Sequence, residues 1–374
     1  MQRTFKYRIY ANKETLTKSE NWLRLCCNLY NCALEERIDA YKKQQETLSG
    51  YDQANELVEL KNSFLEYKLV GSQTLQGVIE RLNRSYQSFF RRIKNNEKVG
   101  FPRFKSSKRY DSFLLKNTGW KLDGKKLLIR NLGQFNIRLS RKIEGKIKTI
   151  TIRRTSSNEW YACFNCDEVP EKLLPQSDKV VGLDMGIKSY LTDSEGSHIE
   201  NPKWLKHSQR ILRVKQRKLS RAKKDSNRRK ETRLQITKLH EKVVNQRKDW
   251  QHKLANQYIQ NYGTIVIEDL NIKGMVRNHH LAKAISDCAW GKFFQLLKYK
   301  AEEAGRDIVE SYRFKPTSKT CSSCGAINKT LKLSDREWVC QTCGTLHDRD
   351  ENAARNIKES GFGQNLQTLT CSTS

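Results

Sequence analysis

The hydrophobic and polar positions of the first hundred residues predict one strand followed by helices. Apolar and charged side chains alternate over residues 1–10, which is typical of a half-buried β-strand. Helical spacing then continues to about Arg92, with one break near Gly50. Over residues 72–92 the apolar positions form a continuous stripe opposite a face rich in glutamine and arginine. We therefore expect a helical domain over residues 11–96.

From residue 97 the apolar period changes from helical to alternating. Short alternating runs, separated by turn residues, predict antiparallel strands. The runs cover residues 112–115, 126–130, 135–139, 148–153 and 160–166. This pattern predicts a small antiparallel β-barrel, which the first strand would join. The barrel would then consist of residues 1–10 and 97–178, with the helical domain inserted into it.

Apolar strands that alternate with helices predict an α/β domain in the second half of the chain. The expected strands cover residues 179–183, 189–192, 264–267 and 308–312, and the expected helices cover residues 203–253, 290–303 and 350–357. Residues 203–253 contain 19 lysines and arginines against four acids, with apolar residues at helical spacing. They predict a long basic helical pair that bends near Asp225. We assign residues 179–316 and 346–360 to this domain and expect residues 361–374 to be disordered.

The charge of the chain indicates the class of its partner. The 374 residues include 71 lysines and arginines but only 41 acids, so the net charge is +30. Nucleic acid neutralises such a charge and releases counterions, which favours a nucleic-acid partner. The mean hydropathy is −0.79, and no apolar run approaches the length of a membrane span. The N-terminus has no secretory signal pattern, so we expect a cytoplasmic, nucleoid-associated protein of a prokaryote.

Four of the eleven cysteines have the spacing of a zinc ribbon. They form two Cys-x-x-Cys pairs, Cys321 with Cys324 and Cys340 with Cys343. Gly325 and Gly344 follow the pairs and permit the tight turns on which two thiolates approach one ion. We predict one structural zinc in a ribbon over residues 317–345, the alternative being free or redox-active cysteines. Cys163 and Cys166 lie in a predicted strand, point to opposite faces and are interpreted as core.

Carboxylates stand where three predicted elements begin or end. Asp184 and Glu268 end buried strands, and Asp348 and Asp350 follow the ribbon, with Asp350 beginning a helix. Oxygen ligands of this kind suit Mg²⁺, and two such ions about 4 Å apart support in-line attack on a phosphodiester. Each acid taken by itself could instead be a helix cap or a salt-bridge partner. Together, in so basic a chain, they favour a nuclease.

These motifs, in this order, resemble the transposon-encoded TnpB proteins, compact relatives of type V CRISPR effectors. The resemblance rests on residues 182–186, residues 265–270, the zinc ribbon and residues 348–357. Shorter matches lie at residues 5–10, 72–76 and 101–105. The resemblance implies a wedge β-barrel with an inserted helical recognition domain. It also implies an RNase H-like (RuvC-like) nuclease domain that the zinc ribbon interrupts.

The resemblance further implies an RNA-guided DNA endonuclease that acts as a monomer with one RNA. A guide RNA from the transposon end would pair with target double-stranded DNA next to a short flanking motif. The catalytic acids, which would also hold two Mg²⁺ ions, would be Asp184, Glu268 and Asp350. Asp350 is preferred to Asp348 because the family's aspartate precedes x-Asn.

Several residues are candidates for nucleic-acid contacts. Gln73 and Gln76 lie on the polar face of the helix over residues 72–92, and amide side chains can pair with adenine edges; the alternative is ordinary solvated surface. The candidate phosphate contacts are Lys215, Arg217, Arg221, Arg228 and Arg229. Tyr110 and Trp120 could stack on bases, although a core position is favoured.

Three other functions remain open at this point. One is a nuclease-inactive, RNA-guided repressor, which the intact acids argue against. Another is a transposase that joins DNA strands without a guide. The third is a guide-free, structure-specific nuclease.

Overall fold

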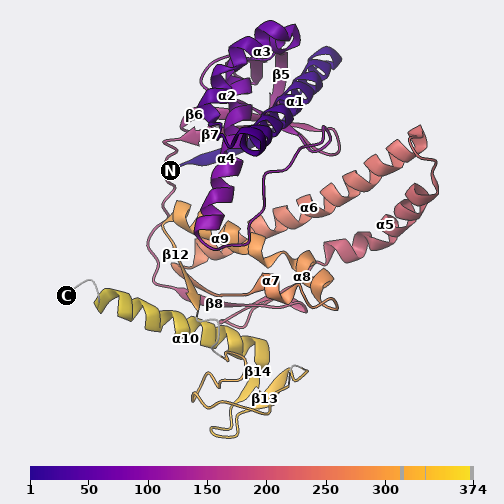
Figure 1. Ribbon diagram of the computed structural model, residues 1–374. Helices are drawn as coiled ribbons and strands as arrows, with labels where there is room; N and C mark the ends of the chain where they lie inside the picture. Colours follow the sequence, from indigo (N-terminus) through magenta and orange to yellow (C-terminus); the bar gives the residue numbers. More distant parts are fainter. Residues whose placement is uncertain (312–315, 333, 371–374) are drawn as a thin grey trace. The chain divides into compact units, whose positions relative to one another are not determined.

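The computed structural model describes residues 1–311, 316–332 and 334–370, with side chains as far as Gly361. The chain divides into two compact units, of which the first ends at Pro170 and the second begins at Glu171 (Figure 1). Among the described residues, no helix is long and apolar enough to cross a membrane.

A seven-stranded antiparallel sheet forms the base of the first unit. Its order is β2-β6-β7-β1-β5-β4-β3. The strands are β1 (Arg3–Tyr10), β2 (Ser112–Leu115), β3 (Trp120–Asp123), β4 (Lys126–Ile129), β5 (Gly133–Arg138), β6 (Lys146–Arg154) and β7 (Trp160–Asp167). The first strand joins the sheet as predicted, between β5 and β7. The predicted runs do not include the four-residue strand β3, although Trp120 and Leu122 alternate there with polar residues.

The predicted β-barrel is present in part: the sheet is a curled half-barrel with β2 and β3 as its edges. Helices pack against β2 instead of a closing strand. Trp22 of the first helix lies on Phe113 of β2, with ring centroids 5.4 Å apart. The aromatic side chain covers apolar surface that a closing strand would otherwise have to cover.

The helices of the first unit share one core with the sheet. They are α1 (Lys13–Gln44), α2 (Gly50–Asn55), α3 (Leu57–Ser63), the 3₁₀ helix η1 (Leu65–Leu69) and α4 (Ser72–Lys94). The apolar stripe of α4 is buried as predicted. Tyr110 is 3% exposed and Trp120 packs against the same core, so the favoured core positions are confirmed. Of the two cysteines interpreted as core, Cys166 is fully buried and Cys163 is half-buried.

A five-stranded mixed sheet organises the second unit, in the order β10-β9-β8-β11-β12. The strands are β8 (Val180–Met185), β9 (Ser189–Asp193), β10 (His198–Glu200), β11 (Thr264–Glu268) and β12 (Asp307–Ser311). Strand β11 pairs in parallel with both β8 and β12, whereas β9 and β10 are antiparallel. This arrangement confirms the predicted mixture of strands and helices.

The helices of the second unit are α5 (Trp204–Arg221), α6 (Asn227–Asn261), α7 (Ile272–Met275), α8 (Ala282–Cys288), α9 (Trp290–Ala304) and α10 (Arg349–Thr370). Figure 1 shows α5 and α6 as a long hairpin that extends away from the sheet. The ribbon contains β13 (Glu337–Val339) and β14 (Leu346–Asp348), so its hairpin reaches Asp348, beyond the predicted end at residue 345. Helix α10 continues to Thr370, whereas the sequence predicts a disordered tail from residue 361; residues 371–374 lie outside the described residues.

Two glycines allow α10 to approach the sheet at backbone distance. A methyl group at Gly182 of β8 would lie 2.2 Å from the carbonyl oxygen of Ala354, inside any permitted contact. A methyl group at Gly361 of α10 would lie 2.5 Å from the Val266 side chain of β11. Because glycine has no side chain at these two positions, the helix that begins at Arg349 can pack closely against the central strands.

We predict that Gly182→Ala pushes α10 away from β8 and lowers the free energy of unfolding by about 1–3 kcal/mol. Gly100→Ala is the matched control, because nothing lies within 4 Å of a methyl group there. Thermal unfolding of both variants measures the difference. Equal melting temperatures for wild type and Gly182→Ala would contradict the close approach.

Candidate functional site

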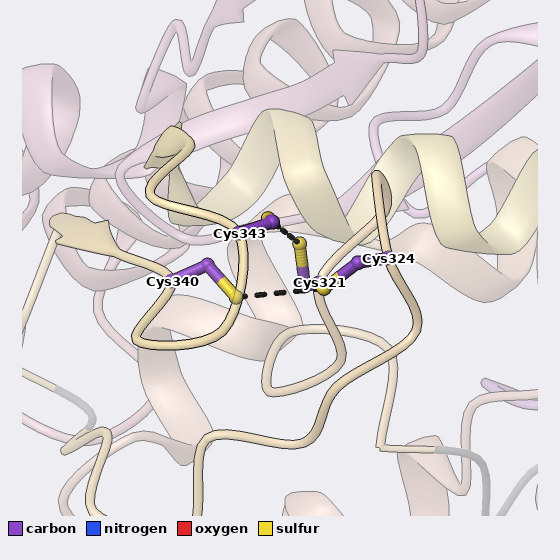
Figure 2. Close-up of side chains that lie close together, drawn as sticks. All are labelled: Cys321, Cys324, Cys340 and Cys343. Atoms are coloured by element: carbon purple, nitrogen blue, oxygen red, sulfur yellow. Dashed lines mark hydrogen bonds between the residues drawn. The ribbon is translucent and has the colours of Figure 1, made fainter.

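The four ribbon cysteines converge as the spacing predicts. Their sulfur atoms lie within 4.8 Å of one another. Cys321 Sγ is 3.6 Å from Cys343 Sγ, and Cys324 Sγ is 3.6 Å from Cys340 Sγ (Figure 2). A tetrahedral zinc with Zn–S bonds of about 2.3 Å requires sulfurs about 3.8 Å apart, so the arrangement fits a structural zinc site.

Two equivalent turns hold these sulfurs. The amide of Gly325 donates to the carbonyl oxygen of Cys321 at 2.9 Å, and that of Gly344 donates to Cys340 at 2.8 Å. Both glycines have positive φ, +77° and +71°, which other residues rarely adopt.

Sequence reasoning missed buried His347, whose Nε2 lies 3.0 Å from Cys321 Sγ.

The three predicted catalytic acids come from adjacent elements of the second unit. Leu183 of β8 pairs with Ile267 of β11, so Asp184 and Glu268 are the next residues in register on neighbouring parallel strands. Such partners share a face of the sheet. Helix α10 packs on both strands and carries Asp350 in its first turn.

The electrostatics of Asp184 show that these acids influence one another. Burial, followed by the charges of Glu268 and Asp350, raises the pKa of Asp184 to about 7. Burial, followed by the charge of Asp269, also raises the pKa of Glu268. Several carboxylates in a partly buried place repel one another, and a divalent cation relieves this repulsion.

Asp348 and Asp350 have different tasks. Asp348 Oδ1 accepts hydrogen bonds from the backbone amides of Asp350 and Glu351, both at 2.9 Å, so it caps α10. The Asp350 carboxylate instead lies 3.1 Å from Arg336 Nη1 and 3.5 Å from Arg349 Nη2. Asp348 is therefore engaged by the backbone at the start of α10, whereas Asp350 is engaged by arginine side chains.

The three carboxylates are not drawn as tightly together as the cysteines. Within the described ranges, the four cysteines alone form a group of three or more ligand atoms within 4.8 Å of one another. The Asp350 carboxylate is held in ion pairs with Arg336 and Arg349. The Asp184 carboxylate has a different environment, because burial and neighbouring acids raise its pKa. The donor set, all carboxylate oxygens, has the chemistry that Mg²⁺ prefers.

Two asparagines of α10, whose role the sequence did not reveal, join the ribbon to the helix. Buried Asn356 donates to the carbonyl oxygens of Thr317 and Thr320 at 2.8 and 2.6 Å. Asn352, 1% exposed, donates to Thr320 at 2.7 Å and accepts from the Ser322 amide at 2.9 Å. The first zinc turn is thus fastened to the helix that carries Asp350. Asparagine repeated at helical spacing, i and i+4, was the signal that could have revealed this role.

Three of the predicted phosphate contacts gather at the tip of the α5–α6 hairpin. Arg217, Arg221 and Arg228 line one cavity of about 390 Å³, together with Lys218. All four side chains belong to exposed residues. A cluster of cations around one hollow suits an anion such as a phosphate.

The other two predicted phosphate contacts are used within the hairpin. Arg229 Nη1 donates to the carbonyl oxygens of Leu219 and Ala222, at 2.8 and 3.0 Å, and so satisfies the end of α5. Lys215 Nζ donates to Gln235 Oε1 at 2.7 Å, across the two helices. Their structural contacts argue against a primary role in phosphate binding.

The two glutamines at the start of α4 differ in exposure. Gln76 is exposed, whereas Gln73 is half-buried and accepts a hydrogen bond from the Thr118 amide at 3.3 Å. Gln73 also lines a cavity of about 420 Å³ to which Lys61, Lys68 and Arg130 contribute. This is a polar, basic hollow at the junction of the helices and the sheet.

Comparison with known proteins places the chain in a family. Residues 164–279 match the OrfB_IS605 model, described as "Probable transposase", and residues 290–357 match the "Cas12f1-like, TNB domain". Residues 1–46 match a "Helix-turn-helix domain", although here they form β1 and the single helix α1. A Streptomyces pristinaespiralis protein named "Putative RNA-guided DNA endonuclease" is 34% identical and aligns over 97% of this chain and 90% of its own.

The chain belongs to the TnpB family of RNA-guided DNA endonucleases. InsQ of Escherichia coli K12, which is named in the same way, is 29% identical over 96% of this chain and 92% of its own. The Cas12f1 endodeoxyribonuclease of Sulfoacidibacillus thermotolerans is 28% identical over 54% of this chain and 50% of its own.

Solved structures support the fold of this TnpB-family chain. A Cas12f1 chain, solved by cryo-EM with sgRNA and target DNA, has a TM-score of 0.59 at 15% identity; the match covers 96% of this chain and 98% of that one. The mini-RNA-guided endonuclease Cas-phi3 has a TM-score of 0.50 at 10% identity, covering 96% and 92%. At these identities the matches concern the fold alone.

We predict that Cys340→Ser abolishes stoichiometric zinc and unfolds the ribbon, because metal binding supplies the folding free energy of such small elements. Cys32→Ser is the control, since Cys32 is exposed and outside the cluster. Metal analysis of the purified proteins and proteolysis of the ribbon measure the effect. Retention of one zinc per chain in Cys340→Ser would contradict the site.

We also predict a pH-dependent stability effect at Asp184 in buffer without added divalent cations. Because its pKa in the folded chain is raised to about 7, the folded state retains a proton that the unfolded state loses near pH 4. The charge therefore destabilises the fold increasingly as the pH rises from about 4 to about 7. Asp184→Asn should match wild type near pH 4 and melt at a higher temperature above pH 7. Melting curves across this range test it, and a difference independent of pH would refute it.

Proposed function

We propose that this chain is a Mg²⁺-dependent endonuclease that cuts DNA next to a short flanking motif, at sites chosen by guide–target base pairing. The observation that carries the proposal is the grouping of Asp184, Glu268 and Asp350 on β8, β11 and α10, where burial and mutual charge raise the pKa of Asp184 to about 7. Membership of the TnpB family supports the same activity.

The three acids would hold two Mg²⁺ ions at the end of the parallel strands. Bound divalent ions would stabilise the charge that develops during in-line attack on a phosphodiester. Asp184 must lose its proton to serve as a ligand, which its raised pKa permits near neutral pH. Arg336 and Arg349 fix the Asp350 carboxylate, so they orient this ligand on the helix.

The mixed sheet supports assignment as an RNase H-like (RuvC-like) nuclease domain. Its strand order, with the antiparallel strands at one side and parallel β8, β11 and β12 at the other, agrees with the arrangement that the family implies. The ribbon, holding one Zn²⁺ on its four cysteines, would interrupt this domain and join α10 through Asn352 and Asn356.

The partners would be a guide RNA from the transposon end and target double-stranded DNA, with one RNA bound by a monomer. The net charge of +30 and the arginine-lined cavity at the α5–α6 tip support binding of a polyanion. The protein would read the duplex by shape and backbone, while base pairing supplies sequence specificity. Our candidate for reading the flanking motif is the basic hollow that Gln73 lines. Gln76, three residues later in the sequence, is exposed and is the second candidate.

We predict that Asp184→Ala lowers cleavage of a guide-matched plasmid roughly a hundredfold or more, because it removes a metal ligand worth several kcal/mol. RNA binding should remain, since Asp184 lies in the nuclease site. The matched control is Asp178→Ala, an exposed acid just before the same strand.

The proteins are expressed with the native flanking DNA, and the RNA that co-purifies is sequenced. One discrete RNA ending in sequence beyond the transposon boundary, together with cutting by wild type and Asp178→Ala, supports the proposal. Wild-type cleavage without RNA would indicate a guide-free nuclease instead. RNA-dependent binding without cleavage would indicate a repressor.

A further inference from the structure

Three phenylalanines are exposed at the end of α4 and on the loop that leads to β2. The exposed fractions are 57% for Phe90, 48% for Phe101 and 56% for Phe104. A single exposed apolar residue is ordinary, but several together on a folded chain mark a binding surface.

Contacts between rings fix two of these side chains in place. Phe89 at the end of α4 lies 5.2 Å from Phe90 and 5.3 Å from Phe101, measured between ring centroids. Tyr86 lies 5.6 Å from Phe101. The helix end and the following loop therefore share one aromatic cluster.

The far end of the loop is also anchored. The backbone amide of Lys105 donates to Asn31 Oδ1 at 2.8 Å, and Asn31 Nδ2 donates to the Lys105 carbonyl oxygen at 2.8 Å. Phe104 is thus displayed on a loop that α1 holds at the next residue. Such a surface loses little conformational freedom when it binds a partner.

The segment that carries these rings is strongly positive in sequence. Residues 84–109 contain nine lysines and arginines and one acid. The basic residues are Arg84, Arg91, Arg92, Lys94, Lys98, Arg103, Lys105, Lys108 and Arg109. None of the nine forms an ion pair with an acid in the part of the chain that the structure describes.

We propose that this aromatic–basic surface, Phe90, Phe101 and Phe104 with the nine cations, binds unpaired nucleotides of the guide RNA. Bases would stack on the phenyl rings, and the lysines and arginines would contact the phosphates. A single strand fits because base faces are hidden inside a duplex. RNA fits better than DNA because a target remains paired until it is opened, whereas a guide offers unpaired bases from the outset. The inference rests on the proposed function for its partner.

Phe104→Ala tests the surface cleanly. Phe104 makes none of the ring contacts found among the described residues, so its loss leaves the aromatic cluster intact. The matched control is Phe64→Ala, because Phe64 is also 56% exposed but lines a hollow with Glu56 and Glu59. Phe104→Trp should restore binding, since a larger ring also stacks.

The probe is a fluorescent oligoadenylate of about twenty nucleotides, compared with an abasic ribose-phosphate strand of the same length, on the full chain. We expect Phe104→Ala to bind oligoadenylate about fivefold or more weakly, in line with the loss of one stacked base. Binding of the abasic strand and the salt dependence should stay at wild-type values, because the charge is unchanged. Phe64→Ala should behave as wild type with both strands.

Unchanged oligoadenylate affinity in Phe104→Ala, or equal losses on both strands, would overturn the inference. Tighter binding of single-stranded DNA than of RNA of the same sequence would also overturn it, in favour of displaced DNA as the occupant. Each of these results can occur while the wild-type protein still carries its RNA and cuts plasmid DNA. The proposed function is therefore judged separately, by the cleavage activity of Asp184→Ala.

Discussion

The backbone contact between α10 and β8 is the constraint on which the candidate nuclease site depends. Asp184 is carried by the strand and Asp350 by the helix, so the distance between the two elements sets the distance between the two carboxylates. A side chain at position 182 would increase the distance between β8 and α10, and a side chain at position 361 would increase the distance between α10 and β11. A helix seated on ordinary side chains would stand farther from the sheet, because helix packing distances depend on the side chains at the contact.

The same helix connects the nuclease site to the metal ribbon. Asn352 and Asn356 bind the carbonyl oxygens that precede the first zinc turn, and Arg336, which lies between the two cysteine pairs, reaches the Asp350 carboxylate. The ribbon therefore also contacts the helix that carries Asp350. Its fold, which would depend on metal, positions an arginine against one of the proposed catalytic acids, so loss of zinc would also disturb the electrostatics of the site.

The positive charge of the chain serves more than one purpose. Within the basic hairpin, Arg229 satisfies the carbonyl groups at the end of α5 and Lys215 bridges the two helices, whereas Arg217, Arg221 and Arg228 surround a hollow. In the first unit, nine cations share residues 84–109 with three exposed phenylalanines. A basic sequence therefore indicates the class of partner, but the structure separates cations that hold the fold from cations that are available to a ligand.

The sequence by itself determined the features that consecutive residues encode. The zinc cluster depends on two short turns, and the acids stand at the ends of apolar runs, so spacing and periodicity were sufficient for both. Only the tertiary structure decided features that depend on distant segments. The sheet is a half-barrel because helices cover β2, Asp348 caps α10 while Asp350 faces the arginines, and the asparagines of α10 bind the ribbon. Each of these outcomes depends on which chemical groups meet across the fold, and local pattern carries no record of such contacts.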